Sequence, residues 1–322
     1  MSMATIARQR NKSGVHSTKQ SVGVRIKNEL IRNRYLYLLL IPVAAYYLLF
    51  HYGPMFGLVI AFKNYNMGQG ILNSPWVGLQ YFKEFFSGIY FKRTLANTFI
   101  ISFTDILFGF PLPIIFALLM NELRSNKLKK VVQTVTYLPH FISMVVICGM
   151  ITDFFSVDGV ITKLIESLGG ENISYIASPK WFRTIYISTN VWQSFGWNSI
   201  IYLAALTGVD AELYEAATID GAGRFKQLWH VTLPGILGTI MIMLIMRLGQ
   251  VLSVGYEKII LLYSTSTMEV ADVISSYVYR MGIGGNRYSY SAAVGLFQSA
   301  VNVIMLLLAN RLSAKASDTS LF

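Results

Sequence analysis

Long uncharged stretches alternate with short polar segments along most of this chain. Between Arg34 and Lys63, for example, no Asp, Glu, Lys or Arg occurs. Runs of about eighteen or more apolar residues are typical of membrane-spanning helices. The pattern predicts six spans, which lie within residues 35–62, 94–120, 131–152, 184–209, 234–254 and 288–310. We therefore predict an all-α integral membrane protein with six transmembrane helices.

The distribution of charge predicts how these spans are oriented. Cytoplasmic flanks of membrane helices are enriched in Lys and Arg, and residues 1–34 are rich in both, with a single acid, Glu29. We therefore expect both termini and the polar segment 210–232 in the cytoplasm. The expected organisation is a basic tail (1–34), a first span with an external loop (35–93), a transmembrane core (94–310) and a second tail (311–322).

Composition agrees with a membrane protein. Apolar residues make up 54% of the chain and charged residues 13%, whereas about a quarter of a soluble chain is charged. The net charge of +11 has an ordinary cause in the basic flanks. Nucleic-acid binding is disfavoured, because the basic tail has no interleaved aromatic residues. The lone Cys148 excludes an internal disulfide.

Motifs for catalysis are missing from the sequence. No phosphate-binding loop and no nucleophile elbow occur. The four histidines are scattered, without the spacing of metal ligands. We therefore expect no catalytic residue, no metal and no cofactor in this chain.

The polar segment 210–232 predicts two short helices joined by a sharp turn. Asp210 fits the N-cap of the first helix. Gly221 and Gly223 allow the turn, since glycine accepts positive φ. We call this segment the elbow. An elbow next to a membrane span either lies on the surface without a partner or offers its apolar face to one.

The second elbow helix is predicted to be amphipathic. Phe225, Leu228 and Trp229 fall on one face at i, i+3, i+4 spacing. Thr232 then fits an N-cap, and Pro234 fits the first turn of a new apolar helix.

The elbow resembles the coupling motif of permeases of bacterial ATP-binding-cassette importers. That motif reads Glu-Ala-Ala, three residues, Gly, nine residues, Ile, one residue, Leu-Pro. The matching residues here are Glu215, Ala216, Ala217, Gly221, Leu233 and Pro234, and Val231 replaces the Ile. Asp220-Gly221-Ala222 has the form common among sugar permeases.

The resemblance implies a type I importer permease fold in a bacterial inner membrane. It also implies a second homologous permease, two ATPase subunits that hold ATP and Mg, and an extracytoplasmic substrate-binding protein. This chain itself would contact membrane lipid. The elbow would be the coupling helix that contacts the ATPase. The residues expected to form it are Glu215, Ala216, Ala217, Asp220, Gly221, Ala222, Gly223, Phe225, Leu233 and Pro234. Rival classes are a secondary transporter or channel without an ATPase, and a membrane scaffold.

Polar residues inside the predicted spans are candidates for a substrate path. A helix that starts at Pro234 places Arg247 roughly 20 Å along its axis, past the middle of a bilayer core of about 30 Å. Arg247 either meets an anionic or hydroxyl-rich substrate or pairs with Asp105 or a neighbouring subunit. The other candidates, for which helix packing is the alternative role, are Trp192, Trp197, Asn198, Gln298 and Asn302.

The predicted substrate is an acidic, alginate-like oligo- or polysaccharide. Residues 53–62 and 137–143 resemble the subgroup of permeases for complex saccharides. Basic groups in the predicted external and membrane segments favour a polyanion; they include Lys83, Lys92, Arg93, Lys180, Arg183, Arg247, Arg280 and Arg287. The alternative is a neutral oligosaccharide.

Overall fold

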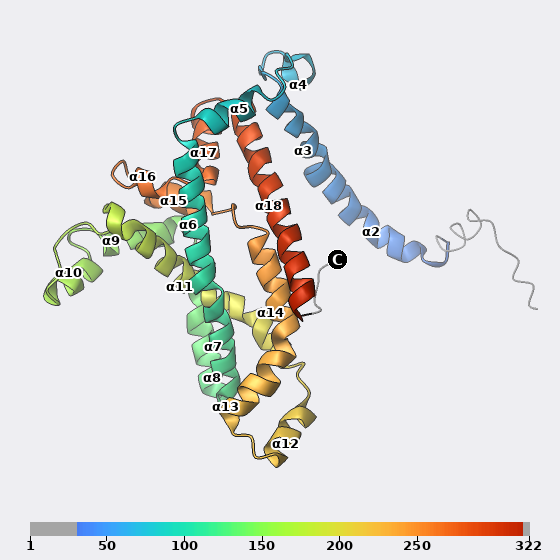
Figure 1. The fold of residues 1–322 in the computed structure, drawn as a ribbon, viewed down its shortest axis with the longest axis vertical. Coiled ribbons are helices and arrows are strands. Elements are labelled where there is room, and N and C mark those ends of the chain that lie inside the picture. The colour runs from blue at the N-terminus through green and yellow to red at the C-terminus, as the bar shows by residue number, and fades with distance from the viewer. Residues whose placement is uncertain (1–30, 318–322) are drawn as a thin grey trace, which may run out of the picture. The chain divides into compact units, whose positions relative to one another are not determined.

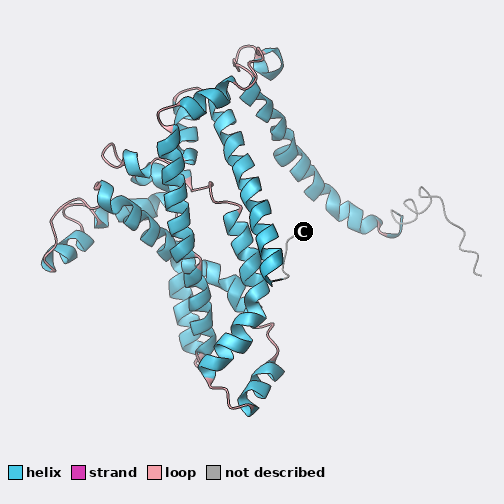
Figure 2. Ribbon diagram, viewed as in Figure 1, coloured by secondary structure: helices cyan, strands magenta, loops and turns pink. Residues whose placement is uncertain are grey.

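The computed structural model describes residues 31–317 and divides the chain into two units, 1–57 and 58–322. The predicted basic tail therefore lies almost entirely outside the described residues. Within them the chain is helical and contains no strand beyond one isolated antiparallel bridge, Lys63–Trp76 (Figure 2). The predicted all-α fold is confirmed.

The first unit is built on one long helical stretch. Helix α2 (Arg34–Tyr47) continues through a π-helical segment (Leu48–Tyr52) into α3 (Gly53–Met55). The π segment ends just before Gly53-Pro54, where the proline has no N–H to donate and its ring crowds the preceding turn. No residue of α2 is buried within the chain. An all-round apolar helix of this kind is typical of a membrane span.

The second unit begins with a 3₁₀ segment (Phe56–Phe62, which starts in the first unit), α4 (Gly70–Asn73) and α5 (Gln80–Ser87). Helices α6 (Phe91–Gly109) and α7 (Pro111–Glu122) follow and together form one apolar stretch of 32 residues. The stretch is interrupted at Phe110, because the next residue, Pro111, has no N–H to donate and its ring crowds the preceding turn.

The third predicted span is not a single straight helix. Helix α8 (Asn126–Tyr137) leads through a 3₁₀ turn (Leu138–Phe141) into α9 (Met144–Phe154), and the two parts are bent by 98°. The bend has a local cause, because Pro139 cannot continue the helix and the Ser143 hydroxyl accepts a hydrogen bond from the first turn of α9. The third span therefore stays a prediction, and its residues form a bent pair of helices. Helix α10 (Val160–Ser167) follows.

Helix α11 (Pro179–Leu206) is the centre of the second unit. Its 28 residues pack against α6, α7, α8 and α14 (Leu233–Leu248). Gly196 permits the close approach to α8, because a Cβ there would lie 2.3 Å from the carbonyl oxygen of Thr136. Helix α18 (Tyr288–Ser317) lies beside α14 (Figure 1).

Short helices occupy the two ends of the second unit. The elbow helices α12 (Ala211–Ile219) and α13 (Arg224–Gln227) lie at one end. Near the opposite end lie α5 and α17 (Figure 1). Between α14 and α18 the chain forms short elements, which are α15 (Tyr256–Leu262), α16 (Met268–Ala271), α17 (Ile274–Tyr279) and a π segment (Arg280–Gly284).

Four helices of the described residues are long and apolar enough to cross a membrane, or five if the bent α8–α9 pair forms one span. Helix α11 is more polar, but its 28 residues extend over roughly 42 Å, more than the bilayer core. Six spans therefore stay a prediction.

Candidate functional site

The elbow turns where its sequence predicts. The Asp210 carboxylate accepts a hydrogen bond from the Glu212 N–H at 3.0 Å, so the predicted N-cap is confirmed. Gly221 has φ +77°. The N–H groups of Gly221 and Ala222 donate to the carbonyls of Thr218 and Ala217 at 3.0 and 2.8 Å, which is the Schellman pattern of a glycine-terminated helix.

The two glycines of the turn have different roles. Gly221 requires the left-handed backbone region, whereas Gly223 has φ −70°, open to any residue, and precedes α13. The Gln227 amide then ties the two elbow helices together. It donates to the Thr218 hydroxyl at 2.9 Å and to the Ala222 carbonyl at 3.2 Å.

The predicted N-cap role of Thr232 was wrong, although Pro234 does lie in the first turn of α14. Helix α13, a π segment (Leu228–Thr232) and α14 form one continuous helical stretch of 25 residues. Thr232 has helical φ and ψ and caps nothing; its hydroxyl lies 3.0 Å from the Tyr214 hydroxyl. The π segment ends just before Leu233-Pro234, so it absorbs the proline without ending the helix, as in the first unit.

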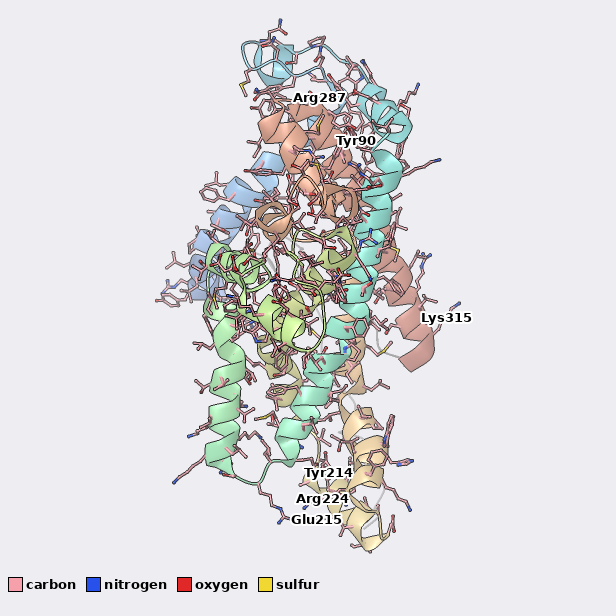
Figure 3. The ribbon with its side chains drawn as sticks, turned by 90° about the vertical axis from the view of Figure 1, so that its left-hand side faces the viewer. Tyr90, Tyr214, Glu215, Arg224, Arg287 and Lys315 are labelled. Carbon is pink, nitrogen blue, oxygen red and sulfur yellow. The ribbon has the colours of Figure 1, made fainter. Side chains whose placement is uncertain are left out.

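The amphipathic face of the second elbow helix is divided. Leu228 packs against the apolar cluster between α7, α11 and α14. Phe225 is 74% exposed and Trp229 55% exposed, with ring centroids 6.3 Å apart. Glu215 is also exposed and lies with Tyr214 and Arg224 at the elbow end of the unit, away from Tyr90 and Arg287 at the other end (Figure 3). The elbow thus presents a carboxylate and two unburied aromatic rings.

Two adjoining cavities lie among α6, α11 and α14. They have volumes of about 260 and 210 Å³ and share Asp105, Arg247 and Gln250 in their walls. The Arg247 guanidinium forms an ion pair with the buried Asp105 carboxylate, whose other oxygen accepts from the Asn190 amide at 2.7 Å. The predicted alternative of an internal Asp105–Arg247 pair is therefore observed. The Arg247 side chain is 47% exposed, so much of it also faces open space.

The backbone after α14 is not helical, although the fifth span was predicted to continue to residue 254. The helix ends at Leu248, and Gly249 comes so close to α18 that a Cβ would lie 2.7 Å from Leu306. Polar side chains on neighbouring helices satisfy the irregular backbone. Gln298 donates to the Leu252 carbonyl at 2.9 Å, and Asn302 accepts from the Leu252 N–H at 3.0 Å. Irregular backbone at membrane depth is tolerated where protein covers it or it lines a cavity.

The remaining path candidates are not assembled in one place. Asn198 lines the 210 Å³ cavity with Arg247. Trp197 stacks on His140, with ring centroids 4.6 Å apart and planes at 4°. Trp192 lines a separate, mostly apolar pocket beside α9. Only Asn198 and Arg247 therefore share a cavity among the six candidates, and Gln298 and Asn302 support the segment that borders it.

Sequence reasoning missed Lys258. Its side chain is 2% exposed, yet it lines the 260 Å³ cavity. Its ammonium lies 5.4 Å from the Tyr186 ring centroid and has no hydrogen-bond partner among the described residues. Lys258 lies between the fifth and sixth predicted spans, in a polar connecting segment where a lysine is ordinary. The apolar run that follows it, Ile259–Leu262, is the signal of burial, and α15 packs against α9.

Several basic groups that favoured an acidic substrate have internal partners. Arg183 donates to the Asn97 side chain at 2.7 Å, and Arg280 pairs with the buried Asp272 at 2.6 Å. Arg287 pairs with Glu84 at 2.5 Å, and this hydrogen bond raises the pKa of Arg287. The external positive charge available to a substrate is therefore smaller than the sequence suggested. In the described part of the chain, no three His, Cys, Asp or Glu side chains are placed to hold a metal ion.

Comparison with known proteins identifies the family. Residues 109–318 match the inner membrane components of binding-protein-dependent transport systems, and the chain belongs to this family. It is 45% identical to protein LplB of Bacillus subtilis (strain 168), over 99% of this chain and all of that protein. It is 44% identical to YteP of the same organism, a polygalacturonan/rhamnogalacturonan transport system permease, over 92% of this chain and 93% of that protein.

Solved structures agree. A chain of a bacterial ABC transporter involved in the import of the acidic polysaccharide alginate superposes with a TM-score of 0.83 at 42% identity, covering 90% of this chain and 99% of that one. A chain of a bacterial alginate ABC transporter in complex with a periplasmic protein bound to alginate pentasaccharide gives 0.84 at 41%, covering 92% and 100%. The protein is thus a membrane permease subunit of an ABC sugar importer with the type I fold. It is not an enzyme, and separate subunits hydrolyse the ATP.

Proposed function

We propose that this permease imports an acidic oligo- or polysaccharide. Relatives support this substrate class, because one is named for polygalacturonan/rhamnogalacturonan transport and two similar structures for alginate. The observation that carries the proposal is the buried Lys258 ammonium, which has no hydrogen-bond partner among the described residues, on a residue that lines a cavity among the spans. The other cation of that wall, Arg247, is paired with Asp105. A buried cation without a partner favours an anionic ligand, because buried charges are normally paired.

The importer proposed here has five components. A second, homologous permease encloses the path together with this chain, and two ATPase subunits bind ATP and Mg on the cytoplasmic side. An extracytoplasmic binding protein delivers the saccharide. Both termini and the elbow of this chain lie in the cytoplasm, and the α5–α17 end faces outward.

The elbow is proposed to couple ATP hydrolysis to transport. Phe225 and Trp229 enter an apolar groove of the ATPase, and the Glu215 carboxylate makes a polar contact beside them. The turn is formed by Asp220, Gly221, Ala222 and Gly223, and it follows the last turns of α12, which contain Ala216 and Ala217. Because the helix runs without a break from Arg224 through Leu233-Pro234 to Leu248, a displacement of the elbow reaches Arg247, roughly 35 Å along the axis. ATPase closure therefore changes the cavity and alternates its access.

Transport by the complete importer tests the substrate. All components are reconstituted in proteoliposomes, and ATP-dependent uptake of uronate oligomers is compared with uptake of neutral oligosaccharides of equal length. We expect uronate uptake to be at least tenfold faster. Uptake of neutral saccharides alone would contradict the substrate and leave the importer assignment intact.

A further inference from the structure

Lys258 is a buried cation without a buried counter-ion of its own. Its side chain is 2% exposed, and its ammonium makes no hydrogen bond within residues 31–317. Buried charges are normally paired, because loss of hydration is costly. An unpaired ammonium on a residue that lines a cavity therefore indicates a binding site for an anionic group of a ligand that enters the cavity.

The acidic groups around the cavity do not fill this role. Both oxygens of Asp105 are already engaged, one by Arg247 and the other by Asn190. Glu257 also lines the cavity, but it is exposed and adjoins Lys258 in the chain without a hydrogen bond to it. Two basic residues, one paired carboxylate and one exposed carboxylate thus line the same cavity.

The ammonium is held in position by its surroundings. Tyr186 on α11 lies beneath it, with the ring centroid 5.4 Å from Nζ, a distance at which an aromatic face attracts a cation. Helix α15 packs against α9 and carries Lys258 into the cluster that contains Ile259 and Tyr186. Lys258 therefore lines the 260 Å³ cavity on a rigid support, and its amine is covered by the surrounding side chains.

We propose that Lys258 is the specificity-determining residue of the substrate cavity and binds a carboxylate of the passing saccharide. This inference rests on the proposed function and specifies which group recognises the acid. Asp105 meanwhile keeps Arg247 in an internal pair, so the substrate does not have to break that pair to bind. A carboxylate gains a charge-assisted hydrogen bond from Lys258, about twice as strong as the neutral bond that a sugar hydroxyl forms. Uronates are thereby favoured over neutral sugars.

The test uses the complete importer in proteoliposomes. Lys258→Met removes the charge, Lys258→Gln removes it but keeps a polar group, and Lys258→Arg keeps it. Lys163→Met, on exposed α10, is the matched control for loss of one positive charge. Initial uptake of a uronate oligomer is measured for each variant, together with ATPase activity stimulated by the binding protein and the Tm of the complex.

We expect both neutral variants to lower uronate uptake at least tenfold, while Lys258→Arg keeps at least a third of it and Lys163→Met stays within twofold. ATPase activity is expected to stay within twofold in the control Lys163→Met, and the Tm of Lys258→Met is expected not to fall, because an unpaired buried charge is removed. Unchanged uronate uptake in either neutral variant would overturn the proposal. Loss of assembly in both would assign Lys258 a structural role and overturn it equally. If the wild-type importer takes up no uronate, the proposed substrate fails as well, and this outcome is distinguishable from the others.

Discussion

The elbow and the cavity differ in how their residues are brought together. The elbow is contiguous from Asp210 to Thr232, mostly exposed up to Lys226, and built by local rules such as an N-cap and a glycine-terminated helix. The cavity takes Asp105, Asn190, Arg247 and Lys258 from four helices and buries polar groups among them. A docking surface can thus be predicted from one short segment of sequence. A path through the spans can be described only when the packing of the helices is known.

A test of the membrane topology has the largest expected effect, because a cysteine is labelled by an impermeant reagent from one side of the membrane and not from the other. In a Cys148→Ala background, single cysteines at Lys226, Asn172 and Asn286 are treated with an impermeant thiol reagent from each side. We expect the position at Lys226 to react only from the cytoplasm and the other two only from outside. Outside labelling at Lys226 would remove the elbow from the reach of an ATPase and so break the comparison.

The Asp105–Arg247 pair is the next most sensitive feature. Arg247→Gln leaves the buried Asp105 carboxylate without its charged partner, and hydrogen bonds to charged groups contribute about 1.5–3 kcal/mol. We expect Arg247→Gln to lower the Tm and to reduce uronate uptake more than neutral-sugar uptake. Asp105→Asn combined with Arg247→Gln is expected to recover both the Tm and the uronate uptake, because Lys258 supplies the recognition and no unpaired carboxylate remains to repel the acid. Recovery of the Tm alone would show that Arg247 also binds the substrate.

The two glycines of the elbow form a matched pair for the next test. Gly221→Val forces a β-branched residue into the left-handed region, which costs about 1–2 kcal/mol, whereas Gly223→Val is placed at φ −70° in open space. We expect Gly221→Val to reduce uptake per ATP hydrolysed at least fivefold and Gly223→Val to change it less than twofold. Equal behaviour of the two variants would show that the turn geometry does not transmit motion.

The divided face of the second elbow helix gives the smallest effect on the isolated permease. Phe225→Ser removes an exposed ring, and we expect a Tm change within 1 °C (about 0.5 kcal/mol or less for an exposed site) but at least fivefold weaker ATPase association. Leu228→Ala, on the packed side of the helix, is expected to give the opposite result: it lowers the Tm and leaves ATPase association largely unchanged. ATPase binding that is insensitive to Phe225→Ser would contradict docking through this face.

Much of the elbow could be predicted because its interactions are local. The Asp210 cap and the positive φ of Gly221 follow from the residues themselves. Thr232 was misassigned because its preference for an N-cap competes with the packing of α14, and a π segment let the helix pass through Pro234. Propensity is a weak guide where tertiary contacts decide.

The cavity was less predictable, because its residues come from separate helices and their contacts depend on tertiary packing. Arg247 was visible as a charge inside an apolar run, but its partner was left open until α6 and α14 were seen together. Trp192 and Trp197 do not line the cavity that holds Arg247. Gln298 and Asn302 form hydrogen bonds with the backbone of Leu252. Side-chain type indicates what a group can bind, and only packing indicates what it meets.

By itself the sequence determined the helical class, the membrane character, the family and the chemistry of the elbow, because hydrophobic period, capping and glycine φ act within a few residues. Tertiary structure decided the end of α14 at Leu248 and the burial of Lys258. Both depend on contacts between segments far apart in the chain, because the close approach of Gly249 to α18 and the packing of α15 against α9 outweigh local preference.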